Sequence, residues 1–65
     1  MRLEVGKYYW WRMRVGKRYS WRLIFIGGVC GHVCSFLAYR PGELDGCNIS
    51  CPRSLMGTVV GPIGR

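Results

Sequence analysis

The longest stretch of the chain without a charged residue is residues 23–39, seventeen residues that include no Asp, Glu, Lys or Arg. Arg22 precedes this apolar run, and Arg40 and Pro41 follow it. A helix of this length is roughly 26 Å long, which just crosses the hydrocarbon core of a bilayer when flanking residues anchor it. The pattern therefore predicts a mainly α fold with a single transmembrane helix over about residues 21–39.

Small residues recur every four positions within the apolar run, at Gly27, Gly31 and Ser35. On a helical projection the bulky side chains, such as Phe25 and Phe36, lie on the opposite side. Small residues at this spacing let a second helix approach closely in a membrane. We therefore expect Gly27, Gly31 and Ser35 to form a helix-packing face. A strand is not favoured, because the run has no alternation of period two.

Residues 1–22 interleave aromatic side chains with arginines and lysines. Two local structures compete here. One is a hairpin in which Tyr8–Val15 pairs with residues 18–26 across Gly16 and Lys17, and the other is an interfacial helix interrupted at Gly6 and Gly16. We interpret this part as an interfacial segment, because rings with one polar end suit the headgroup level of a bilayer. The expected anchors on both sides of the membrane are Trp10, Trp11, Trp21, Arg22, Tyr39 and Arg40.

Two other interpretations of these aromatic residues stay open. They can pack as a cluster on a partner protein, or they can stack on the bases of RNA. Residues 40–65 are expected to form an irregular, extended tail, because Pro41, Gly42, Pro52 and Pro62 interrupt regular structure. Residues 56–60 can form one short strand within this tail.

The formal net charge of +7 is unevenly distributed. Residues 1–22 contain seven basic residues and one acidic residue, which gives +6, whereas residues 23–65 contain three and two, which gives +1. In a membrane protein this asymmetry places the N-terminus on the cytoplasm-, matrix- or stroma-like side. We expect an uncleaved integral membrane anchor, with the mitochondrial inner membrane favoured. In a soluble protein the same charge predicts a nucleic-acid surface.

Four cysteines form two C-x-x-x-C pairs, Cys30 with Cys34 and Cys47 with Cys51. We expect the first pair to be inert within the membrane helix. The second pair would lie in an oxidising compartment, where it can close a small disulfide loop. The alternative is a zinc site made of all four thiolates, although ligand pairs in zinc modules are usually two residues apart.

The twin pairs, separated by twelve residues, resemble those of the small chaperones of the mitochondrial intermembrane space. The resemblance implies a helical hairpin stapled by two disulfides. This sequence departs from that family at Gly27, Gly28 and Pro52, which interrupt the long charged helices that the family needs.

His32 lies near the middle of the apolar run. A histidine at membrane depth can ligate haem iron or chlorophyll magnesium, or it can hydrogen-bond to a neighbouring helix. We favour the hydrogen bond and expect no cofactor. The three carboxylates and one histidine of the chain offer no acid–base pair, nucleophile triad or phosphate loop, so we expect no enzyme activity.

The sequence thus predicts a non-catalytic, single-pass accessory subunit that stabilises a large membrane complex of respiratory or photosynthetic type. Its partners would be other subunits and the lipid bilayer. The alternative is a small basic RNA-binding component of a ribosome or another ribonucleoprotein, with nucleic acid as its partner and with zinc as a bound metal.

Overall fold

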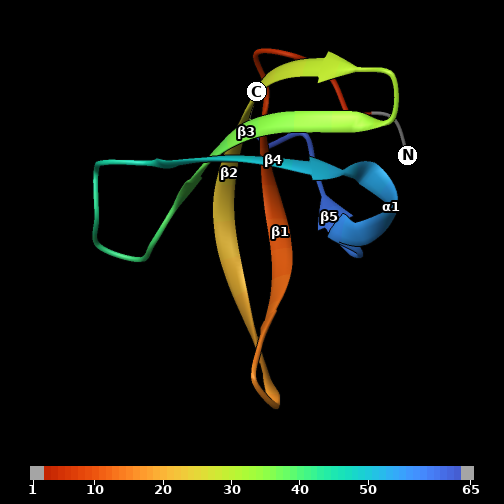
Figure 1. Ribbon diagram of the computed structural model, residues 1–65. Coiled ribbons are helices and arrows are strands. Elements are labelled where there is room, and N and C mark those ends of the chain that lie inside the picture. Colours follow the sequence, from red (N-terminus) through yellow and green to blue (C-terminus); the bar gives the residue numbers. More distant parts are fainter. Residues whose placement is uncertain (1–2, 64–65) are drawn as a thin grey trace.

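A computed structural model describes residues 3–63 and contains one five-stranded antiparallel sheet with the strand order β4-β3-β2-β1-β5 (Figure 1). The first four strands follow one another along the sheet, and β5 returns to pair with β1. The elements are β1 (Tyr8–Val15), β2 (Arg18–Cys30), β3 (Val33–Tyr39), β4 (Cys47–Pro52), the short helix α1 (Arg53–Met56) and β5 (Val59–Val60).

The N-terminal hairpin, one of the two local structures that the sequence left open, is present. β1 and β2 pair in register from Tyr8 opposite Phe25 to Val15 opposite Arg18, across a two-residue turn. Gly16 has a φ of +62° in this turn, a conformation that glycine adopts without steric cost. Residues 5–22 are therefore not an interfacial helix.

The predicted transmembrane helix is wrong. Residues 23–39 form the second half of β2, a turn at Gly31 and His32, and the whole of β3. Within residues 3–63 the structure contains no helix with the length and apolar character needed to span a bilayer. The mainly α fold, the membrane-protein interpretation and the expected position in the mitochondrial inner membrane are corrected accordingly.

The apolar run is continuous because β2 and β3 lie in the middle of the sheet. Burial alternates strictly along β3, and its inward-facing residues Cys34, Phe36 and Ala38 are buried. Its outward-facing residues, which include Leu37 and Tyr39, are half-buried rather than exposed. A strand that is apolar on both faces shows no alternation in its sequence, and its charge-free run resembles that of a buried helix.

The core lies on the inner side of the bent sheet. Its largest fully buried side chains are Tyr9 from β1, Ile24 and Ile26 from β2, and Phe36 from β3. Met56 of α1 and Val59 of β5 close the core from the C-terminal part of the chain. Residues 47–60 are thus an integral part of the sheet and its cover, whereas the sequence predicted an irregular tail.

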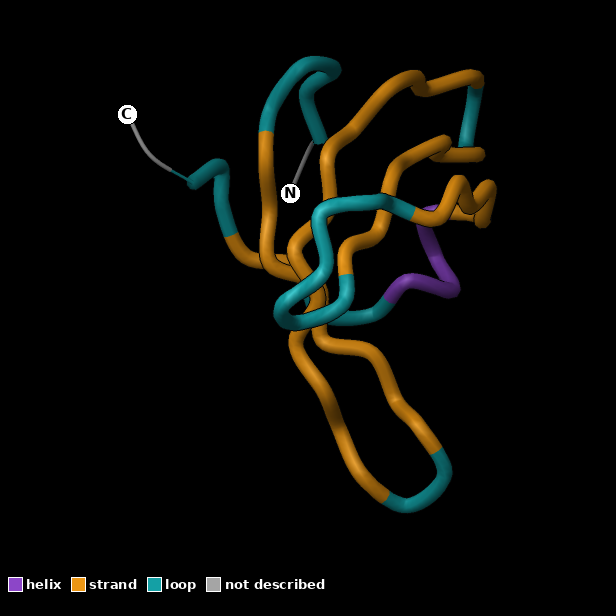
Figure 2. Tube along the Cα trace, turned by 90° about the vertical axis from the view of Figure 1, so that its left-hand side faces the viewer, coloured by secondary structure: helices purple, strands orange, loops and turns teal. Residues whose placement is uncertain are grey.

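One end of the first hairpin extends beyond the rest of the sheet. β2 pairs with β3 only from Leu23 onwards, and β5 pairs with β1 only at Trp10 and Trp11. Residues 13–22 therefore form a two-stranded projection, here called the basic ribbon, that has no further strand beside it (Figures 1 and 2).

Candidate nucleic-acid interface

The outward face of the β1–β2 hairpin carries four exposed aromatic side chains. Tyr8 and Trp10 come from β1 and are each 43% exposed, whereas Tyr19 and Trp21 come from β2 and are 58% and 45% exposed. Alternate residues of a strand point to the same side of the sheet, so these four share one face with two arginines. We call this set the aromatic–basic face; it comprises Tyr8, Trp10, Arg12, Arg14, Tyr19 and Trp21.

The arginines of this face lie among its aromatic rings. Arg12 is opposite Trp21 in the register, and Arg14 is opposite Tyr19. The guanidinium carbon of Arg12 lies 4.4 Å from the centre of the Tyr19 ring, a cation–π contact. Arg14 donates from Nε to the carbonyl of Gly16 at 3.0 Å. Both guanidinium groups keep further N–H donors at an exposed surface.

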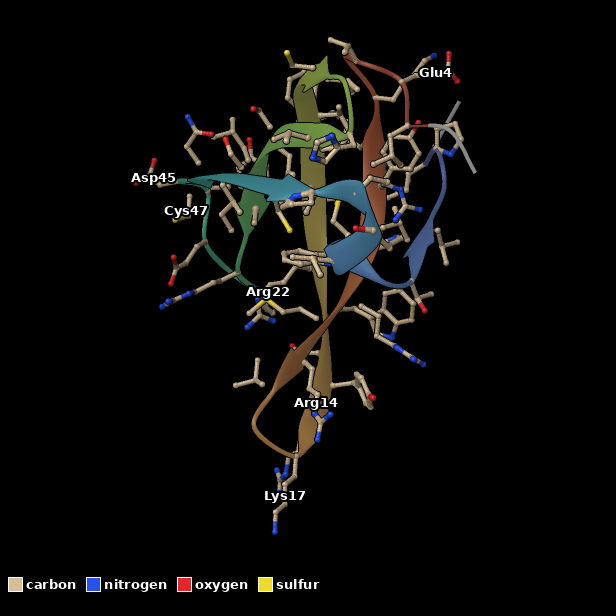
Figure 3. The ribbon with its side chains drawn as sticks, turned by 45° about the vertical axis from the view of Figure 1, so that its right-hand side comes forward. Glu4, Arg14, Lys17, Arg22, Asp45 and Cys47 are labelled. Atoms are coloured by element: carbon tan, nitrogen blue, oxygen red, sulfur yellow. The ribbon has the colours of Figure 1, made fainter. Side chains whose placement is uncertain are left out.

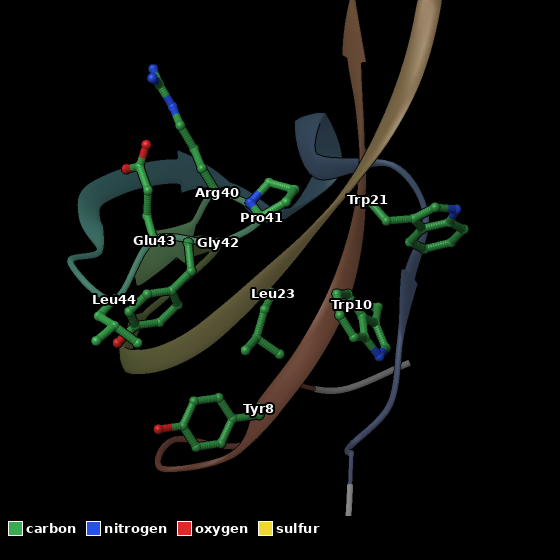
Figure 4. A pocket seen from close by; sticks show the side chains of 10 residues that line it. Tyr8, Trp10, Trp21, Leu23, Arg40, Pro41, Gly42, Glu43 and Leu44 are labelled. Atoms are coloured by element: carbon green, nitrogen blue, oxygen red, sulfur yellow. The ribbon is translucent and has the colours of Figure 1, made fainter.

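Two shallow hollows of about 500 Å³ each adjoin Trp10 and Trp21. The first, the loop-side hollow, extends towards the loop after β3 (Figure 4). Its lining includes Tyr8, Trp10, Trp21, Leu23, Tyr39 and the loop residues 40–44. The second, the β5-side hollow, is lined by Trp10, Trp21 and Val60.

The hairpin that carries this face contains basic residues but no acidic residue. Residues 8–30 contain five basic residues and no Asp or Glu. Figure 3 shows Arg14 and Lys17 at the far end of the basic ribbon, whereas Glu4 lies at the opposite end of the molecule and Asp45 lies beside β4. The hairpin therefore presents a positive potential that favours an anionic partner.

The predicted membrane anchors divide between the two faces of the sheet. Trp10, Trp21, Tyr39 and Arg40 all line the loop-side hollow. Trp11 faces the core side, where its indole N–H donates to the carbonyl of Met56. Arg22 is opposite Trp11 on the same side and donates to the hydroxyl of Ser20. Strand alternation thus separates residues that the sequence placed in one group.

The three small residues predicted to pack against another helix have separate roles in the sheet. Gly27 lies at the β2–β3 register shift between Ile26 and Gly28. Gly31 occupies the β2–β3 turn with a φ of +61°. Ser35 lies on β3, and its hydroxyl oxygen is 3.2 Å from that of Ser50 on β4. No common packing face results.

The cysteines of the predicted disulfide loop, Cys47 and Cys51, both lie in β4. Four residues of extended strand span about 13 Å, whereas the Cα atoms of a disulfide are about 4–7 Å apart. Both thiols are free, as are those of Cys30 and Cys34. Within residues 3–63 no three of the His, Cys, Asp and Glu side chains are grouped so that they could hold a metal ion, so the alternative zinc site is not assembled.

His32 lies in the exposed turn between β2 and β3. Its carbonyl accepts a hydrogen bond from the Arg53 amide at 2.7 Å, which ties this turn to the start of α1. The sequence predicts that the imidazole hydrogen-bonds to a neighbouring helix within a membrane, with haem or chlorophyll ligation as the alternative, whereas the structure places residue 32 in a turn between two strands.

Sequence analysis missed the contributions of Tyr8, Tyr19, Arg12, Arg14 and Val60 to the site. The available signal was the period-two spacing of Tyr8, Trp10, Arg12 and Arg14, which only the hairpin alternative brings onto one face. Val60 gave no signal, because its position depends on the return of β5 to β1.

We compared the chain with protein families, curated proteins and solved structures. No family model matches the chain, and neither a curated protein nor a solved structure matches it.

Proposed function

We propose that this chain binds single-stranded nucleic acid on the aromatic–basic face of its β1–β2 hairpin. The observation that carries this proposal is the interleaving of four exposed rings with Arg12 and Arg14 on one side of two paired strands. Exposed aromatic rings on a sheet are the usual platform for unpaired bases, and neighbouring arginines contact the phosphates. The proposed role is binding without catalysis.

The chemistry of the face favours a nucleic acid over a neutral partner. Aromatic rings contribute stacking area, but a cluster of them alone would also suit a protein partner. The basic ribbon adds Arg14, Lys17, Arg18 and Arg22 with no acidic residue. A polyanion uses both components at once, because its bases stack while its phosphates meet the cations.

The accessory-subunit hypothesis depended on a membrane-spanning helix, which residues 3–63 do not contain. The RNA-binding alternative depended on the charge and on the aromatic residues of the first third of the chain, and four of these aromatic residues form the exposed face together with Arg12 and Arg14. The charge and the exposed rings therefore favour the RNA-binding role.

Fluorescence anisotropy with a labelled ten-residue oligouridylate tests the proposal. Trp10→Ala and Trp21→Ala should each weaken binding about 5- to 150-fold, because stacking contributes about 1–3 kcal/mol per base. Leu55→Ala is the matched control, since Leu55 is 74% exposed on α1 but lies outside the face. Its affinity should equal that of the wild type.

A blunt RNA duplex provides the specificity control. Its bases are stacked internally and cannot reach the rings, so its affinity should be well below that of the single strand at the same salt concentration. Equal affinity for both RNAs, with no effect of either tryptophan substitution, would mean that the face does not bind bases.

A further inference from the structure

The two hollows of the interface share a wall. Trp10 and Trp21 line both of them, because the two residues are diagonal neighbours on β1 and β2. Figure 4 shows the two indoles side by side, with Leu23 between Trp10 and the loop after β3. Each hollow therefore has one indole wall and one separate boundary.

Each separate boundary includes an exposed apolar side chain. Leu44, at the edge of the loop-side hollow, is 95% exposed, so almost none of its side chain is packed in the free protein. Val60, at the edge of the β5-side hollow, is 52% exposed. A planar apolar group entering either hollow would cover these side chains and remove their surface from water.

Two charged residues, Arg40 and Glu43, line the loop-side hollow at its loop edge. The charged ends of Arg40 and Glu43 project from the loop away from Tyr8 and Trp10 (Figure 4). Among residues 3–63, those that line the β5-side hollow carry no charge. An interior of this kind accommodates the faces of a nucleobase but not a phosphate, which would remain at the arginine-bearing surface.

We propose that these hollows are two base subsites, which take two consecutive unpaired bases of one strand on opposite sides of the Trp10–Trp21 wall. The strand then crosses the hairpin from β5 towards the loop after β3. This inference rests on the proposed function and specifies its footprint. The occupant is a single-stranded nucleic acid rather than a peptide, because the adjacent basic ribbon carries four cations and no acidic residue.

Binding of hexauridylates with single abasic positions tests the footprint in the intact chain. Loss of a base at either of two adjacent central positions should weaken binding about tenfold, and loss at the outer positions should change it less than twofold. Leu44→Ser and Val60→Ser should each weaken binding about three- to tenfold. Leu55→Ser is the matched control and should leave affinity unchanged.

The double variant distinguishes two independent subsites from one extended binding patch. Substitutions in independent subsites should have multiplicative effects, so Leu44→Ser with Val60→Ser should lose the product of the single losses. Uniform abasic penalties at all six positions, or unaffected binding by both serine variants, would overturn the subsites while leaving the proposed function intact. Absence of binding by the wild type would overturn both proposals.

Discussion

Trp11 donates its indole N–H to the carbonyl oxygen of Met56 at 2.6 Å, a hydrogen bond between residues 45 positions apart. The same indole meets the Phe36 ring edge-on, with 5.2 Å between ring centres. These contacts join β1 to α1 and to the core. The neighbouring Trp10 points to the opposite side and is 43% exposed. Adjacent tryptophans of one strand therefore have different roles, one in stability and one in the proposed binding.

Substituting these two tryptophans should affect stability unequally. Trp11→Phe removes the indole N–H that donates to the carbonyl oxygen of Met56. This loss should lower the free energy of unfolding by about 1–3 kcal/mol. Trp10→Phe should change it by less than about 0.5 kcal/mol, as is usual for an exposed site. Urea denaturation followed by circular dichroism measures both values. Equal losses would contradict the assignment of Trp11 to the core side.

Gly61 directly follows β5 and lies against the ring of Tyr9. A Cβ atom at this position would lie 2.7 Å from Cδ2 of Tyr9, and the φ of Gly61 is +146°. Gly61→Ala should therefore destabilise the protein by about 1–3 kcal/mol, as expected for a strained backbone with a steric clash. The matched control is Gly28→Ala, because no atom lies within 4 Å of its added Cβ. In thermal unfolding, the Tm of Gly61→Ala should be clearly lower than the Tm of Gly28→Ala.

Much of the N-terminal hairpin was predictable, whereas the central strands were not. The Tyr8–Val15 strand and the Gly16-Lys17 turn have their observed bounds in one of the two alternatives that the sequence leaves open, although that alternative ends the second strand at Ile26 and the structure continues it to Cys30. In residues 23–39 the periodic small residues arise from unrelated causes: a register shift near Gly27 and a turn at Gly31. In this segment the choice between strands and a helix depends on pairing with neighbouring strands, and the local sequence pattern does not show that pairing.

The cysteines give a chemical test of the sheet. Cys34 is 2% exposed on the inner side of β3, whereas Cys30 and Cys47 are exposed at strand ends. A thiol-specific reagent in excess should modify Cys30 and Cys47 rapidly, Cys51 more slowly, and Cys34 only after unfolding. Mass spectrometry of timed digests measures this order. Rapid modification of Cys34 in the native protein would be inconsistent with its burial in the core.

The binding face was only partly predictable from sequence. The aromatic and basic residues of the first third were recognised, and RNA stacking was one of the alternatives. Their division between Trp10 on one face and Trp11 on the other requires the strand register. The hollows require Leu44 and Val60, which approach the hairpin only through the β3–β4 loop and the return of β5.

Salt dependence tests the contribution of the cations. If Arg12, Arg14, Lys17 and Arg18 contact phosphates, the logarithm of the association constant should fall with the logarithm of salt concentration with a slope of about −3 for a single strand. Arg14→Gln should reduce the magnitude of this slope by about 0.7. Arg53→Gln is the control, because Arg53 lies in α1 and hydrogen-bonds to Gly57. Identical slopes for Arg14→Gln and the wild type would exclude Arg14 as a phosphate contact.

The three tryptophan indole N–H resonances give the most direct test of the binding face. In a two-dimensional ¹H–¹⁵N spectrum titrated with hexauridylate, the resonances of Trp10 and Trp21 should shift strongly, because both rings line the hollows. The Trp11 resonance should stay nearly unchanged, because its N–H is bonded to the Met56 carbonyl on the other side of the sheet. Shifts confined to Trp11, or no indole shift at saturating RNA, would contradict base binding on this face.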